Sequence, residues 1–291
     1  MLNKKIAIIF HENDKERAQY YAIKYLAEIW QKRGINTIFV FGTKRFVPAD
    51  LAILHVDLSV VPDEYIEFAQ MYPIVLNGMV KDIRKSIFCD HILYPGDNYE
   101  GKVIVKSNLN YAGIPERRIQ DSPLHGVIRP LWRRAARLKY LGNLERPYFD
   151  SPNDYLILES ARQVPGDWFK RKDIVIEKFL PELDHGYYLT RSYYFLGDRN
   201  QCVLWRSTDP IVKRSSATNM ELVDGHQEIE LLRKKFHFDY GKFDYVLHEN
   251  VPILLDINKT IGASLKDEPN LSEPYMAMRR KWASGIYSFF E

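Results

Sequence analysis

Apolar and polar positions alternate in blocks along the first eighty residues, and these blocks predict strands and helices in turn. The run KIAIIF at residues 5–10 is continuously apolar, which is typical of a strand buried on both faces. Residues 15–33 carry apolar side chains at helical spacing, and Gly34 fits the end of that helix. The blocks that follow predict strands at 36–41, 49–56 and 73–76 and a short helix at 62–71. This alternation predicts a parallel sheet with crossover helices.

The rest of the chain has a different pattern, in which strands dominate from about residue 155 onwards. We expect strands at 102–105, 155–158, 173–179, 187–196, 201–205, 243–247 and 252–257, and helices at 80–87, at about 220–235 and at 273–289. Residues 113–150 are rich in Arg, Pro and Gly and show little periodicity, apart from a helix expected at 130–140. The pattern therefore predicts an α/β front, a mobile insertion and an antiparallel α+β back.

The composition is that of a globular chain with more than one lobe. Hydrophobic residues make up 46% of the 291 residues, which excludes a disordered or coiled-coil protein. At this length two or three packed lobes are favoured over a single core. Lys and Arg number 41 against 38 Asp and Glu, so the formal charge is 41 − 38 = +3. So small an excess does not predict a nucleic-acid partner, because such a partner requires a clustered basic face.

The two cysteines and the apolar runs bear on where the protein works. Cys89 and Cys202 are far apart in the sequence, and two reduced thiols are favoured over the alternative of a disulfide. No stretch approaches the roughly 18 apolar residues that a membrane-spanning helix requires. We therefore expect a cytoplasmic protein with no membrane partner.

Three oxygen-bearing side chains are predicted to gather near the end of the sequence. FDYVL at 243–247 and PILLDIN at 252–258 fit the two strands of a hairpin. Asp256 and Asn258 are two residues apart and so share one face, and Asp244 on the partner strand can come near them. Two carboxylates and an amide oxygen suit Mg²⁺ bound together with substrate phosphates. The alternative is that all three are polar residues on a solvated sheet face.

Two earlier strands end in side chains that can bind a nucleotide. Lys106 ends an apolar run and precedes the small-residue loop SNLNYAG, so its ammonium and the loop N–H groups can hold a phosphate. The strand IVIEKFLPE passes from Glu177 through apolar residues that can lie against a flat base, and Asp184 follows where it can contact a ribose. The alternatives are a strand-end lysine that points to water and a strand that simply leaves its sheet.

In this order, the three segments resemble the ATP-grasp superfamily. The resemblance covers roughly residues 75–265, and the alternating segment before it looks like the domain that usually precedes an ATP-grasp domain. It implies an α/β front domain plus α+β ATP-grasp lobes, with the nucleotide held between two antiparallel sheets. The implied domains are 1–77, a Rossmann-like pre-ATP-grasp domain; 78–180, a central lobe with the mobile basic insertion 113–150; and 181–291, a C-terminal lobe carrying the metal site.

The resemblance also implies a role for each matching residue. The implied cofactor-binding residues are Lys85, Lys106, Ser107, Glu177, Lys178, Phe179, Leu180 and Asp184. The implied catalytic residues are Lys242, Lys213 and Arg214, and the implied metal ligands are Asp244, Asp256 and Asn258. Lys242 stands where an arginine is common and so lacks the bidentate fork, and Asp256 stands where glutamate is commoner.

A reaction follows from the same resemblance. It implies an ATP- and Mg²⁺-dependent ligase that joins a small-molecule carboxylate to an amine in an amide or related bond through an acyl phosphate. The implied cofactors are ATP and two Mg²⁺ ions, with Mn²⁺ as an alternative, and a homodimer is left open. One alternative is a kinase that stops at phosphoryl transfer to a small molecule. The other is a non-catalytic nucleotide-binding protein, against which the complete set of metal ligands argues.

Two further features are open to more than one interpretation. A basic stretch consists of Arg117, Arg118, Arg129, Arg133, Arg134 and Arg137. It fits a solvated helix and loop or a lid over phosphates better than a site for an anionic acceptor or nucleic acid. His11 and Glu12 follow the first strand, where they can contact a substrate or serve only as a cap and turn.

Overall fold

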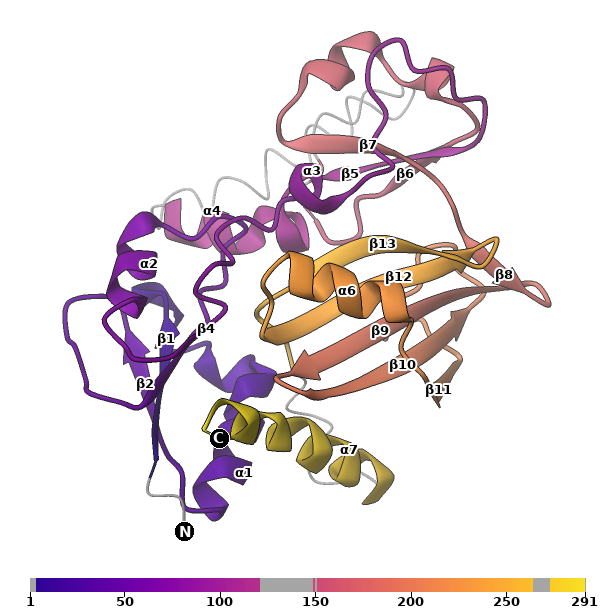
Figure 1. Ribbon diagram of the computed structural model, residues 1–291. Coiled ribbons are helices and arrows are strands. Elements are labelled where there is room, and N and C mark those ends of the chain that lie inside the picture. Colours follow the sequence, from indigo (N-terminus) through magenta and orange to yellow (C-terminus); the bar gives the residue numbers. More distant parts are fainter. Residues whose placement is uncertain (1–3, 121–148, 150, 264–272, 291) are drawn as a thin grey trace. The chain divides into compact units, whose positions relative to one another are not determined.

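The computed structural model describes residues 4–120, 149, 151–263 and 273–290, and the chain forms two compact units. The first, called here the two-segment unit, combines Met1–Asp82 with Pro181–Glu291. The second, the inserted unit, is the intervening stretch Ile83–Leu180. Figure 1 shows the consequence for the two-segment unit, in which indigo helix α1 (Ala22–Lys32) lies beside yellow helix α7 (Glu273–Ser284).

A parallel sheet forms the first layer of the two-segment unit. Its strands run in the order β2-β1-β3-β4, namely β2 (Asn36–Phe41), β1 (Lys5–Phe10), β3 (Leu51–Leu54) and β4 (Val75–Leu76). Central strand β1 is buried from Ile6 onwards because it has a neighbour on each side, with Ile8 opposite both Phe39 and Ile53. The parallel sheet predicted from the sequence is therefore confirmed.

The single helix predicted at 15–33 is wrong in its first half. Two 3₁₀ turns at Glu12–Asp14 and Ala18–Tyr20 precede α1, and Tyr21 between them and the helix is extended, with φ −104° and ψ 144°. The cause is a distant segment, because Tyr21 forms an antiparallel bridge with Gly262 and the N–H of Ala22 donates to the carbonyl of Ile261 at 2.8 Å. Helical spacing alone does not reveal such pairing.

An antiparallel sheet forms the second layer of the two-segment unit. Its order is β11-β10-β9-β12-β13, with β8 also paired to β9. The strands are β8 (Glu182–Asp184), β9 (Tyr187–Leu196), β10 (Arg199–Ser207), β11 (Asn219–Val223), β12 (Tyr240–His248) and β13 (Val251–Asn258). One core joins both layers, since Leu196 and Tyr240 of this sheet pack in the same cluster as Ile8 of the parallel sheet and Trp282 of α7.

The helix predicted at about 220–235 is wrong over its first residues. Residues Asn219–Val223 form β11, which pairs with β10, and helix α6 begins only at Gln227 and ends at Lys235. His226 caps this helix, because its Nδ1 accepts the N–H of Glu228 at 3.3 Å. Residues 219–223 therefore pair with the edge of β10, although their polarity is also typical of a solvated helix.

The inserted unit is built on a three-stranded antiparallel sheet in the order β6-β5-β7. Its elements are α3 (Lys85–Phe88), β5 (Val103–Ser107), a 3₁₀ turn at Asn110–Gly113, α4 (Ile114–Gln120), β6 (Leu156–Leu158), 3₁₀ turns at Ala161–Gln163 and Gly166–Lys170, and β7 (Ile174–Lys178). Its core gathers Val103 and Val105 of β5 with Ile176 of β7 and the buried Trp168. The parallel sheet of the first unit and the antiparallel sheets of both units confirm the expected combination of an α/β front with α+β structure.

Part of the predicted insertion lies outside the described residues. Arg117 and Arg118 lie on α4, whereas Arg129, Arg133, Arg134 and Arg137 of the basic stretch, and the helix expected at 130–140, are not among the residues that the structure describes. Both cysteines are free thiols, with Cys202 buried and Cys89 half-buried. Within the described ranges, the helices are all too short or too polar to cross a lipid bilayer.

His55 directly follows β3 and is fully buried among aromatic rings. The centroid of its ring lies 4.8 Å from that of Phe10 and 4.9 Å from that of Tyr21. Among the described residues neither ring nitrogen has a hydrogen-bond partner. Burial, with a smaller effect of Lys259, lowers the pKa of His55 to about 3. The imidazole therefore packs as a neutral ring.

Candidate functional site

A buried ion pair between Lys106 and Glu177 lies at the centre of the inserted unit. Glu177 on β7 is opposite Ile104 on β5, and Lys106 is two residues further along β5, so both side chains lie on one face of the sheet. The Lys106 Nζ lies 2.7 Å from the Glu177 Oε2, and the two side chains are only 8% and 1% exposed. Because both groups are buried this deeply, each charge needs the opposite charge of the other group beside it.

His91 completes the surroundings of the Glu177 carboxylate. Its Nε2 lies 3.0 Å from the Glu177 Oε2, and its backbone carbonyl accepts the N–H of Lys178 at 3.0 Å. Burial by itself raises the pKa of Glu177, but Lys106 and then His91 outweigh it and lower that pKa to about 2. Burial likewise acts to lower the pKa of Lys106, and Glu177 reverses this and raises it. Both groups are therefore charged at neutral pH.

The second oxygen of the Glu177 carboxylate differs from the first in its hydrogen bonding. Among the described residues the Glu177 Oε1 is buried without a hydrogen-bond partner. A buried acceptor without a donor costs about 1–3 kcal/mol, so such an atom calls for an explanation. A ligand that brings an N–H to this oxygen supplies one.

Cys89, His91 and Glu177 also bring three metal-binding atoms within 4.8 Å of one another. Two observations argue against a metal ion there. Burial raises the pKa of the Cys89 thiol far above its usual range, and the charge of Glu177 raises it further, so the thiolate that a metal needs is disfavoured. The ammonium of Lys106, already 2.7 Å from Glu177, would also lie against the cation.

Lys85 and the loop after β5 lie next to one another. The buried Lys85 donates from Nζ to the carbonyl of Leu109 at 3.3 Å, and its backbone N–H donates to the carbonyl of Asn108 at 3.0 Å. Ser107 at the end of β5 is buried, and its Oγ accepts the N–H of Leu109 at 3.2 Å. Both predicted phosphate lysines and Ser107 are therefore tied to one strand end and the loop that follows it.

That loop turns sharply. Tyr111 and Ala112 have φ of 46° and 55°, and Gly113 follows at 68°. Two non-glycine residues in this left-handed region store about 1–3 kcal/mol each. Such strain is commonly found where a chain holds a ligand.

Lys178 ends strand β7, and Phe179 and Leu180 follow it, so the strand predicted at 173–179 ends one residue earlier than expected. Lys178 has its ammonium 5.4 Å from the centre of the Tyr99 ring. The N–H of Phe179 donates to the carbonyl of Lys102 at 2.8 Å, and the side chains of Phe179 and Leu180 are half-buried. The role predicted for these residues, holding a base, stays a prediction.

The predicted metal ligands lie together on one face of the antiparallel sheet. In the β12–β13 pair, Asp244 is directly opposite Asp256 and Lys242 is directly opposite Asn258. Directly opposite residues point to the same face, with about 4.5–5.5 Å between their Cβ atoms. The hairpin expected from the sequence thus brings all three predicted oxygen ligands and one ammonium onto one surface.

Hydrogen bonds hold these side chains in place. Lys242 donates to the Asp244 Oδ2 at 2.6 Å, and Ser192 on β9 donates to the Asp244 Oδ1 at 2.6 Å. The indole N–H of Trp205 donates to the Ser192 Oγ at 3.1 Å. Burial acts to lower the pKa of Lys242, but Asp244 outweighs this and raises it, so Lys242 is a cation. The Asn258 Nδ2 donates to the Asp256 Oδ2 at 3.3 Å, which fixes the amide.

The remaining predicted residues, Asp184, Lys213 and Arg214, belong to the same two-segment unit. Asp184 on β8 pairs with Arg206 of β10 at 2.6 Å, and this hydrogen bond lowers the pKa of Asp184. Lys213 begins a turn, in which the Ser216 N–H donates to the Lys213 carbonyl at 3.0 Å. The neighbouring Arg214 lines a pocket of this unit. The roles predicted for Asp184, Lys213 and Arg214 stay predictions.

Sequence reasoning missed the partners that hold the predicted residues. The missed residues are His91 beside Glu177, Ser192 beside Asp244 and Arg206 beside Asp184. For His91, the Cys-Asp-His spacing at 89–91 was an available signal. Ser192 and Arg206 carry no local signal. The role of Ser192 follows from the pairing of β9 with β12, and that of Arg206 from the pairing of β9 with both β8 and β10.

Comparisons with known proteins gave similar structures only. No family model and no curated protein matches the sequence. The macrocyclase MdnC bound with precursor peptide MdnA, from Microcystis aeruginosa MRC, is similar with TM-score 0.49 and 10% identity, covering 99% of this chain and 100% of that one. D-alanine–D-alanine ligase from Bacillus anthracis is similar with TM-score 0.49 and 10% identity, covering 99% and 96%.

D-cycloserine synthetase DcsG gives TM-score 0.47 and 11% identity, covering 98% of this chain and 99% of that one. Because all three TM-scores are below 0.5, we base the function on the residues of this chain.

Proposed function

We propose that the protein is an ATP- and Mg²⁺-dependent ligase that joins a carboxylate to an amine through an acyl phosphate. The observation that carries the proposal is the pairing of Asp244 with Asp256 and of Lys242 with Asn258 across one hairpin. Two carboxylates, an amide and an ammonium on one sheet face are the groups that phosphoryl transfer needs, because that reaction depends on positioning and on neutralising charge.

The inserted unit offers the chemistry of a nucleotide site. Lys106 remains an ammonium beside Glu177 at the end of β5, and an ammonium suits phosphate oxygens. The Glu177 Oε1, which no donor of the described residues contacts, can accept a hydrogen bond from an exocyclic amino group such as that of adenine. These two observations fit ATP, and the proposal assigns the phosphates to Lys85 and Lys106 and the base to residues 177–180.

The hairpin offers the chemistry of a magnesium site. Mg²⁺ prefers hard oxygen ligands and usually takes one or two carboxylates together with substrate phosphates. Asp244, Asp256 and Asn258 supply such ligands, and Ser192 orients Asp244. When bound, the metal neutralises phosphate charge during transfer. Lys242 adds a fixed positive charge beside the same oxygens.

The proposed reaction has two steps. A carboxylate oxygen of the acid attacks the γ-phosphorus, the bond to the bridging oxygen breaks, and ADP leaves. The amine then attacks the acyl carbon, the carbon–oxygen bond to phosphate breaks, and the amine loses a proton as the amide forms. Each turnover therefore yields one ADP, one phosphate and one amide.

The test is a turnover screen of the purified protein. Mg·ATP is supplied with pooled organic acids and amines, and ADP and phosphate are measured in parallel. Phosphate released in step with ADP, and only when both an acid and an amine are present, is the expected result. ADP without phosphate would instead identify a kinase. No turnover with any pool, or full turnover by the Asp256→Ala variant, would refute the proposal.

A further inference from the structure

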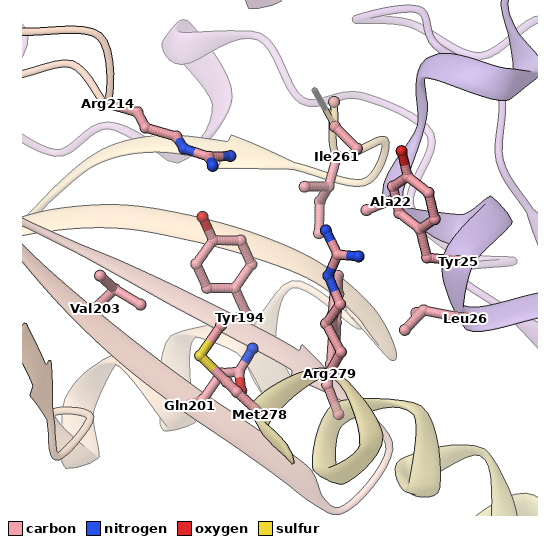
Figure 2. Close-up of a pocket in the computed structure, with 13 residues that line it drawn as sticks. Ala22, Tyr25, Leu26, Tyr194, Gln201, Val203, Arg214, Ile261, Met278 and Arg279 are labelled. Carbon is pink, nitrogen blue, oxygen red and sulfur yellow. The ribbon is translucent and has the colours of Figure 1, made fainter. Parts of the chain in front are cut away.

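A pocket opens in the two-segment unit where three parts of the chain meet. Strands β9 and β10 supply Tyr194, Gln201 and Val203, while helix α1 supplies Tyr25 and Leu26. Helix α7 adds Met278, Arg279 and Trp282, and the segment after β13 adds residues 261–263. Figure 2 shows Tyr194 and Tyr25 on opposite sides, with Arg279 between them and Arg214 at the rim. We call this site the arginine pocket.

The charge of the arginine pocket is one-sided. Arg214 and Arg279 both line it, and none of the described lining residues is acidic. The Arg279 guanidinium lies 4.5 Å from the centre of the Tyr25 ring, which positions it, and within the described ranges no carboxylate pairs with it. A guanidinium presents a planar fork of donors that matches a carboxylate. The pocket therefore favours an anion.

The rest of the lining favours a ligand with an apolar body. Trp282 meets Tyr194 edge-on, with 5.7 Å between ring centroids, and Leu26 and Met278 add aliphatic surface. Two buried polar atoms of the lining, the Gln201 Oε1 and the Trp282 Nε1, have no hydrogen-bond partner among the described residues. Trp282 is only 5% exposed, so its unpaired N–H marks a place where a bound molecule can supply an acceptor.

Sheet register links this pocket to the proposed metal site. Tyr194 is directly opposite Gln201 on one side and Lys242 on the other, and Lys242 is opposite Asn258. These four side chains form one row on one face of the sheet. With about 4.8 Å between neighbouring strands, the pocket wall lies about one strand from Lys242 and about two from Asn258.

We propose that the arginine pocket binds the acid substrate: an organic acid with an apolar body, whose carboxylate pairs with Arg279 and is the group that becomes activated. This inference rests on the proposed ligase function, since it places the acid beside the row that carries Lys242. The apolar body packs on Tyr194 and Trp282. Arg279 contacts the substrate and holds its carboxylate, and Arg214 adds charge at the rim.

The binding test compares acids with uncharged isosteres. Phenylacetate and 4-methylpentanoate are titrated by ligand-observed NMR against the purified full chain, together with phenylacetamide and 4-methylpentanamide. We expect at least one acid to bind at least tenfold more tightly than its amide. The Arg279→Gln variant is expected to bind that acid at least tenfold more weakly, because it loses the fork but keeps a similar volume.

Arg280→Gln is the matched control, because Arg280 is the next residue of α7 and pairs with Glu273 outside the pocket. It should bind the acid as the wild type does. If neither acid binds, if the amides bind equally well, or if Arg279→Gln binds like wild type, the inference is overturned. Arg214→Gln serves as a second test if Arg279→Gln does not fold, and unchanged acid binding by this variant also counts against the proposal.

Turnover separates failure of the inference from failure of the ligase proposal. If acid-dependent ADP forms but Arg279→Gln leaves the KM for the acid unchanged, the pocket assignment is wrong and the ligase stands. If the acid binds through Arg279 but no ADP forms with any amine, the ligase proposal is wrong and the pocket stands. When both hold, Arg279→Gln raises the KM for the acid and leaves the KM for ATP unchanged.

Discussion

Replacing Lys106 by methionine is expected to destabilise the inserted unit strongly. The change removes the ammonium 2.7 Å from the Glu177 Oε2 and leaves a carboxylate that is 1% exposed, with the His91 Nε2 still beside it at 3.0 Å. A buried charge without a counter-charge costs several kcal/mol. Methionine keeps most of the aliphatic length of lysine, so the loss comes mainly from charge and not from a cavity.

The magnitude follows from the pKa of Glu177. That pKa is about 2 against an ordinary value of 4.5, a difference of 4.5 − 2 = 2.5. At about 1.4 kcal/mol for each tenfold change in proton affinity, the difference corresponds to about 3 kcal/mol, shared between Lys106 and His91. Removing one partner of a buried ion pair typically costs about 3–5 kcal/mol, which agrees.

The sign of the pH dependence is also fixed. Because the pKa of Glu177 is lowered in the folded state, the unfolded chain binds more protons between pH 4.5 and pH 2. The stabilisation is therefore complete above about pH 4.5 and is lost as the pH falls toward 2. The Lys106→Met variant should lose most of this dependence.

The assay is urea unfolding at pH 7, supported by hydrogen exchange of the amides of β5 and β7. We expect Lys106→Met to lose about 3 kcal/mol, and Lys106→Met combined with Glu177→Gln to lose less than Lys106→Met alone. The control is Lys102→Met, whose partner Glu159 is exposed, so it should cost less than about 1 kcal/mol. Equal losses in Lys106→Met and Lys102→Met, or no recovery in the double variant, would refute this reasoning.

Three further changes test the hairpin and the core. Asp256→Asn is expected to lower ATP turnover at least about 100-fold with an unchanged urea midpoint; turnover near wild type would remove it from the metal site. Ser192→Ala deletes the hydrogen bond to Asp244 and should raise the Mg²⁺ concentration for half-maximal turnover about tenfold. The control is Ser288→Ala, because the Ser288 hydroxyl donates to the carbonyl of Gly285, near the C-terminus, and should leave that concentration unchanged. As the pH falls from 6.5 toward 3, the wild type should lose about 1.4 kcal/mol of stability per pH unit, because the unfolded chain binds a proton at His55 and the folded chain does not. His55→Phe should abolish this loss, which urea midpoints measured across the same pH range would show. Midpoints of variant and wild type that fall in parallel would contradict this.

Local patterns in the sequence were sufficient for much of the fold. The apolar run at residues 5–10 and the alternation in the hairpin at 243–258 each predicted a strand that the structure contains. Both patterns are local, because burial on two faces or on one face fixes the spacing of apolar residues. The errors at Tyr21 and at β11 share one cause: pairing with a distant segment overrides a local preference.

The sequence predicted those parts of the candidate site whose residues are close together in the chain. Asp256 and Asn258 share a face because they are two residues apart, and Asp244 faces them because the hairpin between the strands is short. The ion pair of Lys106 with Glu177 joins strands that are 71 residues apart (177 − 106 = 71), so no local pattern could reveal it. Arg279, on a helix near the C-terminus, gave no signal of a pocket that it shares with α1.

The two-segment unit has a consequence for how the protein is made. The indole N–H of Trp30 donates to the carbonyl of Ala283 at 2.7 Å, across 253 positions of sequence. At about 5–20 residues per second, a ribosome needs on the order of 10–50 s to add that much chain. Throughout this interval the nascent N-terminal strands lack the core contacts that Trp282 and Ile286 later provide. The inserted unit is one contiguous stretch, so it can already fold. Biogenesis should therefore depend on chaperones that shield the early strands, and a messenger truncated before α7 should yield an insoluble product.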